Sequence, residues 1–115
     1  MTGNTRQQAE SRATNIAREI TAKRTRQQEY HGFSVEHDDR YHNAELAQAA
    51  GTYALVAAFP GREDEIRGRH WPFPDHWLRH GAPRELLLNA ATLIIAEIER
   101  LDRLPQQKDE AENGQ

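Results

Sequence analysis

The stretch PRELLLNAATLIIAEIERLDRL, residues 83–104, constrains the fold of this chain more than any other segment. Its apolar residues recur three and four positions apart, which is the spacing of one face of an α-helix. Pro83 suits the first position of a helix, and Pro105 predicts where the helix ends. At 100° per residue the apolar arc spans roughly 220°, which is too wide for a helix that packs on one neighbour. We therefore expect a central helix over residues 83–104, covered on two sides.

One carboxylate falls inside this apolar arc. On a helical projection Glu97 lies among the leucines and alanines of the arc, whereas Glu85 and Glu99 lie outside it. A carboxylate on a core-facing surface is costly unless it is paired, hydrogen-bonded or functional. Glu97 is therefore the first candidate for a functional residue, and we expect Arg24 and His42 to be its partners.

Two further segments predict helices that pack on the central one. Residues 5–31 carry a thin apolar stripe that turns polar toward its carboxyl end, and Gly32 suits a left-handed helix cap. Residues 39–58 have an alanine-rich core stripe, an aspartate at the expected helix start and a Pro-Gly pair after the end. We expect an all-α bundle of three main helices, about 5–31, 39–58 and 83–104. The stripe of the first helix consists of Ala9, Ala13, Ile16, Ala17 and Ile20.

The segment that joins the second and third helices, residues 60–82, is charged in its first half and holds both tryptophans in its second. We predict an aromatic, proline-rich loop with one helical turn near residues 75–79. Its large side chains are expected to cover the flanks of the central helix, because aromatic residues mainly supply buried area. These side chains are Trp71, Phe73 and Trp77.

The domain organisation follows from the same reading. Residues 1–104 are expected to form a single helical domain. Residues 105–115 contain no large apolar side chain and are expected to form a disordered tail. Because the central arc is wide and the chain is short, we also expect a homodimer.

The composition limits which classes of partner the chain is expected to bind. The 115 residues carry a net charge of −3, so we expect no specific nucleic-acid site, although residues 1–30 hold six Arg or Lys against three Glu. The chain has no cysteine, which excludes disulfides and thiolate metal sites. No apolar run approaches membrane-spanning length, and the start lacks a secretory signal. We therefore expect a cytoplasmic protein without membrane contact.

Polar residues are expected to converge at one end of the bundle, where the first helix ends, the second begins and an antiparallel third helix ends. Cations, amides and imidazoles at a helix start would suit a nucleotide or another small phosphorylated ligand. Asp39, Glu97 and Asp102 would also suit a hard divalent ion, Mg²⁺ or Mn²⁺. The candidate ligand-binding residues are Arg24, Gln27, His31, Asp39, His42, Asn43 and Glu97.

The same cluster also permits a structural interpretation, in which it is a satisfied polar network that fixes helix register. No catalytic residue is assigned, because the sequence has no Ser-His-Asp signature, Gly-rich phosphate loop or Rossmann fingerprint. His76 and His80 have the spacing of a helical zinc pair, but no third ligand is evident, and surface histidines are the simpler interpretation.

Three segments carry a resemblance to known proteins. They are RTRQQEYHGFSVEHDDRYHNAELAQAA, WPFPDHW and RELLLNAATLIIAEIERLDR, and together they span about residues 24–104. They resemble a family of small uncharacterised bacteriophage and prophage proteins with an EHDD turn, an ELA-x-AA helix, a WPW-like loop and a final helix similar to LILAEIERLDR. The resemblance implies a phage or prophage origin and brings no established activity.

A fainter similarity links NAELAQA and RELLLNAA to MazG-like all-α nucleotide pyrophosphohydrolases, whose helices carry carboxylate ligands for magnesium. Glu45 matches one carboxylate of that family, whereas His42 stands in place of a glutamate and Asn89 lies near an expected aspartate. The remaining ligands are too few for two magnesium ions. This resemblance therefore implies at most a degenerate pyrophosphohydrolase.

Three hypotheses for the function remain open. The preferred one is a phage-type accessory protein that binds a nucleotide or another small phosphorylated ligand without catalysis. The first alternative is a helical module that binds a protein through the tryptophan loop and takes no small ligand. The second alternative is a degenerate MazG-like pyrophosphohydrolase.

Overall fold

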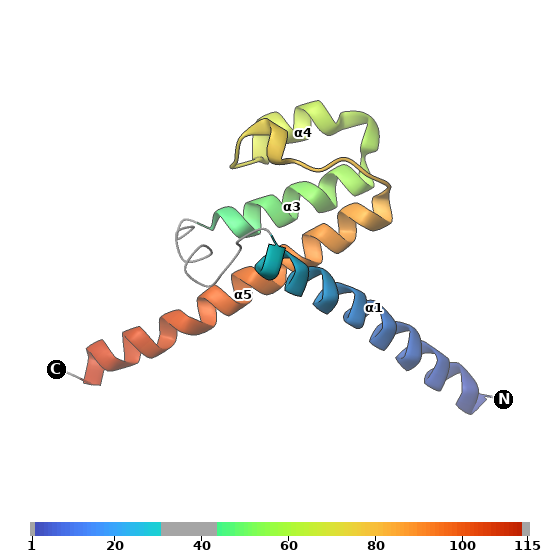
Figure 1. Cartoon of the computed structure of the whole chain (residues 1–115), viewed down its shortest axis with the longest axis horizontal. Helices are drawn as coiled ribbons and strands as arrows, with labels where there is room; N and C mark the ends of the chain where they lie inside the picture. The colour runs from blue at the N-terminus through green and yellow to red at the C-terminus, as the bar shows by residue number, and fades with distance from the viewer. Residues whose placement is uncertain (1, 31–43, 114–115) are drawn as a thin grey trace.

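The computed structural model describes residues 2–30 and 44–113, and their side chains over residues 5–27 and 44–104. Within these ranges the chain is all-α: it forms four α-helices and two short 3-10 helices, and no strand (Figure 1). This confirms the predicted fold class. The helices are α1 (Thr2–Tyr30), α3 (Glu45–Ala58), α4 (Glu63–His70) and α5 (Pro83–Asn113), and the 3-10 helices are η1 (Pro60–Arg62) and η2 (Asp75–Trp77).

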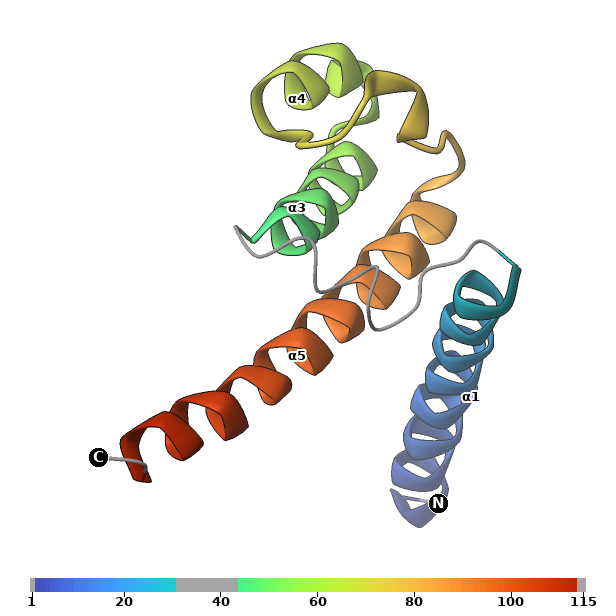
Figure 2. The ribbon, with the colours of Figure 1, turned by 60° about the vertical axis from the view of Figure 1, so that its left-hand side comes forward.

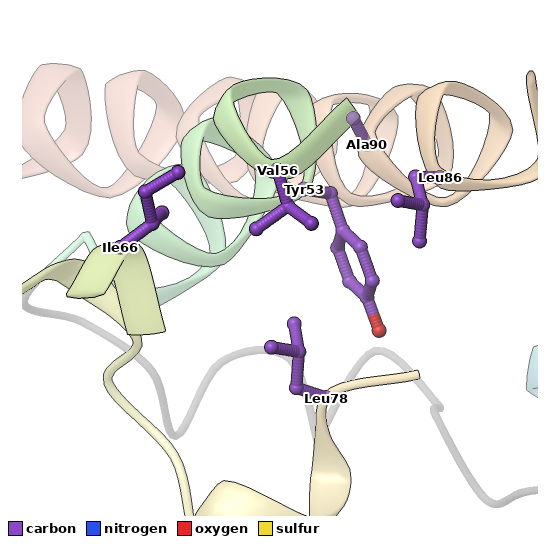
Figure 3. Packing of buried hydrophobic residues seen from close by; sticks show 6 residues of the cluster. All are labelled: Tyr53, Val56, Ile66, Leu78, Leu86 and Ala90. Carbon is purple, nitrogen blue, oxygen red and sulfur yellow. The ribbon is translucent and has the colours of Figure 1, made fainter. Parts of the chain in front are cut away.

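The core lies between α3 and α5, with α4 and the segment after η2 packed over α3 (Figures 1 and 2). In Figure 3 the side chains of Tyr53 and Val56 extend from α3 toward Leu78. Alanines at the α3–α5 contact, such as Ala49 and Ala90, are buried and allow the two helices to approach closely. The core cluster consists of Tyr53, Val56, Ile66, Leu78, Leu86 and Ala90.

The first helix, α1, crosses α5 and contacts it through its carboxyl-terminal part. Arg84 donates a hydrogen bond of 3.3 Å to Glu19, and the ammonium of Lys23 lies 3.9 Å from the carboxylate of Glu85. From this crossing the two helices diverge, so that the chain forms an open V (Figures 1 and 2). Residues 5–18 of α1 are exposed throughout.

This exposure corrects the predicted core face of the first helix. Ala9, Ala13, Ile16 and Ala17 are exposed, and Ile20 is only half-buried. The stripe is made mainly of alanines, which gain little free energy from burial, so it does not hold the amino-terminal part of α1 against the core. The open shape gives a radius of gyration of 17.1 Å. A compact chain of this length would have roughly 13 Å.

The second helix begins later than predicted. Ala44 has φ 68° and ψ 23°, a left-handed conformation that cannot continue into a right-handed helix, and no side chain caps the helix start. The helix α3 therefore starts at Glu45. The predicted cap at Gly32 and the predicted helix start at residue 39 lie outside the described residues.

The charged half of the predicted loop is in fact a helix, α4. Acidic residues fill its first turn and basic residues its last, which complements the helix dipole. Arg67 pairs with Asp64 at 3.0 Å within the helix, and Ile66 anchors it in the core. The predicted helical turn near residues 75–79 appears as η2.

The aromatic residues of this segment form a chain of ring contacts that begins on α3. The rings of Tyr53 and Trp71 meet edge to face with centroids 5.5 Å apart. The ring of Phe73 contacts Trp71 in the same edge-to-face geometry, also at 5.5 Å. Trp77 follows at 5.5 Å and is 45% exposed. Tyr53 of α3 is thus the aromatic partner of Trp71, which also packs against the core cluster that includes Leu86 and Ala90 of α5. Leu78, which follows η2, joins the core cluster together with Leu86 of α5.

The central helix, α5, continues through Pro105 to Asn113, so the predicted end at Leu104 is wrong. A proline removes one helical N–H and crowds the preceding turn, but its fixed φ is that of a helix. The residues after it are rich in Gln, Lys, Glu and Ala, which favour helix. The division into a domain of residues 1–104 and a separate tail stays a prediction.

Candidate functional site

Glu97 is buried, as its position in the apolar arc predicts, with only 7% of its surface exposed. Its carboxylate accepts two hydrogen bonds from Arg100, one turn further along α5. Nε of Arg100 lies 2.6 Å from Oε1 and Nη2 lies 3.2 Å from Oε2. The partner of Glu97 is thus Arg100 of its own helix instead of Arg24, because a spacing of three residues brings both side chains to one face. His42, the other predicted partner, lies outside the described residues.

Arg24 and Gln27 lie where α1 crosses α5. The buried guanidinium of Arg24 has its Nε 3.6 Å from a carboxylate oxygen of Glu99. Gln27 donates a hydrogen bond of 3.3 Å to the hydroxyl of Thr92, and that hydroxyl donates in turn to the carbonyl of Asn89. The α5 carboxylate beside Arg24 is therefore Glu99, which the sequence had placed outside the apolar arc.

The predicted cluster is divided between two faces of α5. Glu97 and Glu99 are two residues apart, which places them roughly 200° apart around a helix. On α5 the Glu97–Arg100 pair and the Glu99 carboxylate beside Arg24 therefore lie on different faces. The remaining candidates fall on residues that the structure does not describe: His31, Asp39, His42 and Asn43.

The metal hypothesis has no support in the described residues, where no group of three or more His, Asp or Glu side chains could hold an ion. Of the three candidate ligands, Glu97 is engaged by Arg100 and Asp102 is exposed. Asp39 lies outside the described residues. Glu45, the residue that matches a carboxylate of the MazG-like enzymes, stands in the first turn of α3 and is half-buried.

A third face of α5 is exposed along its length. Leu87, Ile94, Ile98 and Leu101 are between 45% and 51% exposed, and Ala91 lies in line with them. We call these five residues the seam. Successive members are four, three, four and three residues apart, which is the spacing of the a and d positions of a coiled coil.

Sequence reasoning placed the seam and the core stripe in one wide apolar arc, and expected a homodimer without assigning a part of the arc to its interface. The sequence shows that successive seam residues are alternately four and three positions apart. This spacing is typical of a narrow coiled-coil interface, whereas the apolar stripe of a core helix is wider. That signal would have separated the two faces.

In the described residues no helix combines the length and apolar character needed to cross a membrane. The chain matches no protein-family model, and no curated protein or solved structure shows significant similarity to it.

Proposed function

We propose that this chain is a helical protein-interaction module that works as a homodimer, with the seam on α5 as its interface. The observation that carries the proposal is the exposure of four large aliphatic side chains in one line. Exposed apolar residues that occur singly are ordinary, but a contiguous apolar line marks an interaction surface.

The spacing of the seam indicates what kind of surface it fits. A line of apolar side chains with a mean period of 3.5 residues packs against another helix, because each side chain enters a hole between four residues of the partner. From Leu87 to Leu101 the seam spans 15 residues, and its ends are about 21 Å apart at a rise of 1.5 Å per residue. This is long enough for four turns of helix pairing.

The open shape of the single chain also favours assembly. The core cluster contains six of the described residues, and the radius of gyration of 17.1 Å exceeds that of a compact chain of equal length. A small domain buries a limited fraction of its surface by itself, so burial in an interface adds directly to its stability.

Two matched substitutions test the proposal. Ile94→Glu places a charge in the middle of the seam, and Ile16→Glu makes the same change on α1, where the isoleucine is 45% exposed against 49% for Ile94. Sedimentation equilibrium should show a dissociation constant at least roughly tenfold higher for Ile94→Glu, because apolar burial is lost in both copies. Ile16→Glu should dimerise as the unmodified chain does. Equal dissociation constants for Ile94→Glu and the unmodified chain would refute the seam as the interface.

Binding of a small phosphorylated ligand is a second candidate function, and the burial of two guanidinium groups favours it. Arg24 and Arg100 are each 6% exposed, and buried arginines are suited to phosphate recognition. A phage-type accessory protein that holds a nucleotide without catalysis would fit this feature and the resemblance to phage proteins.

A thermal-shift screen of nucleotides, with and without Mg²⁺ or Mn²⁺, tests this second candidate, because a ligand that binds the native state raises its melting temperature. A hit should shift the unmodified chain and lose its effect in Arg24→Gln. A screen in which no nucleotide shifts the melting temperature would count against the candidate and leave the dimer proposal standing.

A further inference from the structure

We infer that the seam of one copy packs against the seam of a second copy in antiparallel orientation. The inference rests on the proposed dimer and names the partner surface and its direction. In coiled-coil notation Leu87, Ile94 and Leu101 occupy d positions, and Ala91 and Ile98 occupy a positions.

Packing favours the antiparallel direction, because it places a positions opposite d positions. Ala91 then faces Ile94 of the second copy, so that a small residue meets a large one in the middle of the interface. Leu87 faces Ile98 of the second copy. A parallel pair would place the two Ala91 residues opposite each other and leave a gap between layers of larger residues, which costs stability.

Charge favours the same direction. Arg84 occupies the heptad position a that precedes Leu87, and Asp102 directly follows Leu101. Opposite charges therefore stand at the two ends of the seam. Antiparallel packing brings Arg84 next to Asp102 of the second copy, at both ends of the dimer. Parallel packing would bring arginine beside arginine and aspartate beside aspartate, which is unfavourable. Arg84 already donates hydrogen bonds to Glu19 of α1, but its side chain is 60% exposed and Asp102 is exposed, so a second carboxylate can approach the guanidinium.

The other two faces of α5 leave room for this arrangement. Residues that contact α1, such as Glu85 and Thr92, and residues that face α3, such as Leu86 and Ala90, lie to either side of the seam on a helical projection. The second copy would therefore approach a face that α1 and α3 leave exposed, without displacing either helix.

Disulfide trapping tests the inference directly, because the full chain contains no cysteine and introduced thiols are its only ones. Leu87→Cys and Ile98→Cys are prepared as separate full-length variants, one with a tag so that the three possible disulfide-linked products differ in mass. The two are mixed and oxidised. The expected main product is the mixed dimer of Leu87→Cys with Ile98→Cys. A mixture of Leu87→Cys with Ile16→Cys serves as the control and should give no mixed dimer.

The alternative outcomes separate the two proposals. Products that join Leu87→Cys to itself and Ile98→Cys to itself, without the mixed dimer, would overturn the antiparallel direction and leave the seam as the interface. A dimer mass by light scattering without any of the three cross-links would also overturn this inference, because the chains would meet elsewhere. A monomer mass for the unmodified chain would overturn the proposed dimer itself.

Discussion

The buried Glu97–Arg100 pair gives the sharpest test of how the central helix is held in place. Glu97→Gln keeps the size of the side chain and removes its charge. The two side chains are 10% and 7% exposed, so water cannot take the place of the lost carboxylate. Breaking such a buried pair costs about 3 kcal/mol. For a chain of this length that loss lowers the melting temperature by roughly 10 to 20 °C.

Thermal unfolding followed by circular dichroism measures this loss, and Glu99→Gln is the matched control on the same helix. Glu99 has a side chain 39% exposed and lies 3.6 Å from the guanidinium of Arg24, so solvent screens its pair more strongly. Its replacement should cost less than about 1 kcal/mol. A double variant, Glu97→Leu with Arg100→Met, should recover most of the stability that Glu97→Gln loses, because it removes both buried charges together.

Two results would refute this reasoning. If Glu97→Gln lowers the melting temperature no more than Glu99→Gln does, the buried pair does not support the fold. If Glu97→Gln leaves stability intact but abolishes a nucleotide-induced thermal shift, the carboxylate belongs to a ligand site rather than to the scaffold.

Three further predictions concern other parts of the chain. Tyr53→Phe should cost about 1 kcal/mol in urea unfolding, because the Tyr53 hydroxyl accepts a hydrogen bond of 2.9 Å from the N–H of Arg79. Burial raises the pKa of Tyr53, so its contribution is intact below pH 10.0 and declines as the pH rises further; a titration midpoint of the Tyr53 phenol at or below pH 10.0, followed by residue-resolved NMR, would contradict this. The hydrogen bond from Arg84 lowers the pKa of Glu19, so Arg84→Gln should raise that pKa in an NMR titration. In the unmodified chain the contribution of Glu19 is present above pH 4.5 and is lost as the pH falls through the lowered pKa, and an unchanged titration in the variant would show that the pair does not form in solution. Truncation after Leu104 should leave the melting temperature nearly unchanged, and a fall of several degrees would show that the removed residues dock on the domain.

The sequence predicted the central helix and the burial of Glu97 because both follow from a strong local pattern. Leu86, Ala90 and Glu97 lie on one arc, and helical geometry alone brings them to one face. The position of Trp71 near the core also followed from its size. The ring that it contacts, Tyr53, depends on tertiary packing that no local pattern specifies.

Other features depended on choices that periodicity does not determine. A wide apolar arc indicates that a helix has several neighbours, but it does not indicate which part faces α3 and which part is left exposed. Local conformation also overrode the pattern at Ala44, whose left-handed backbone delays the start of α3, and at Pro105, through which α5 continues. Sequence reasoning looked for the partner of Glu97 on other helices, although the spacing of three residues between Glu97 and Arg100 already permitted the pair.

The measurement that tests the central claim most directly is the mass of the unmodified chain in solution. Light scattering coupled to size-exclusion chromatography at micromolar concentration should give twice the chain mass of 13.2 kDa. That result is expected because the seam on α5 exposes Leu87, Ile94, Ile98 and Leu101 unless a second copy covers them. A mass of 13.2 kDa across the micromolar range would contradict the account.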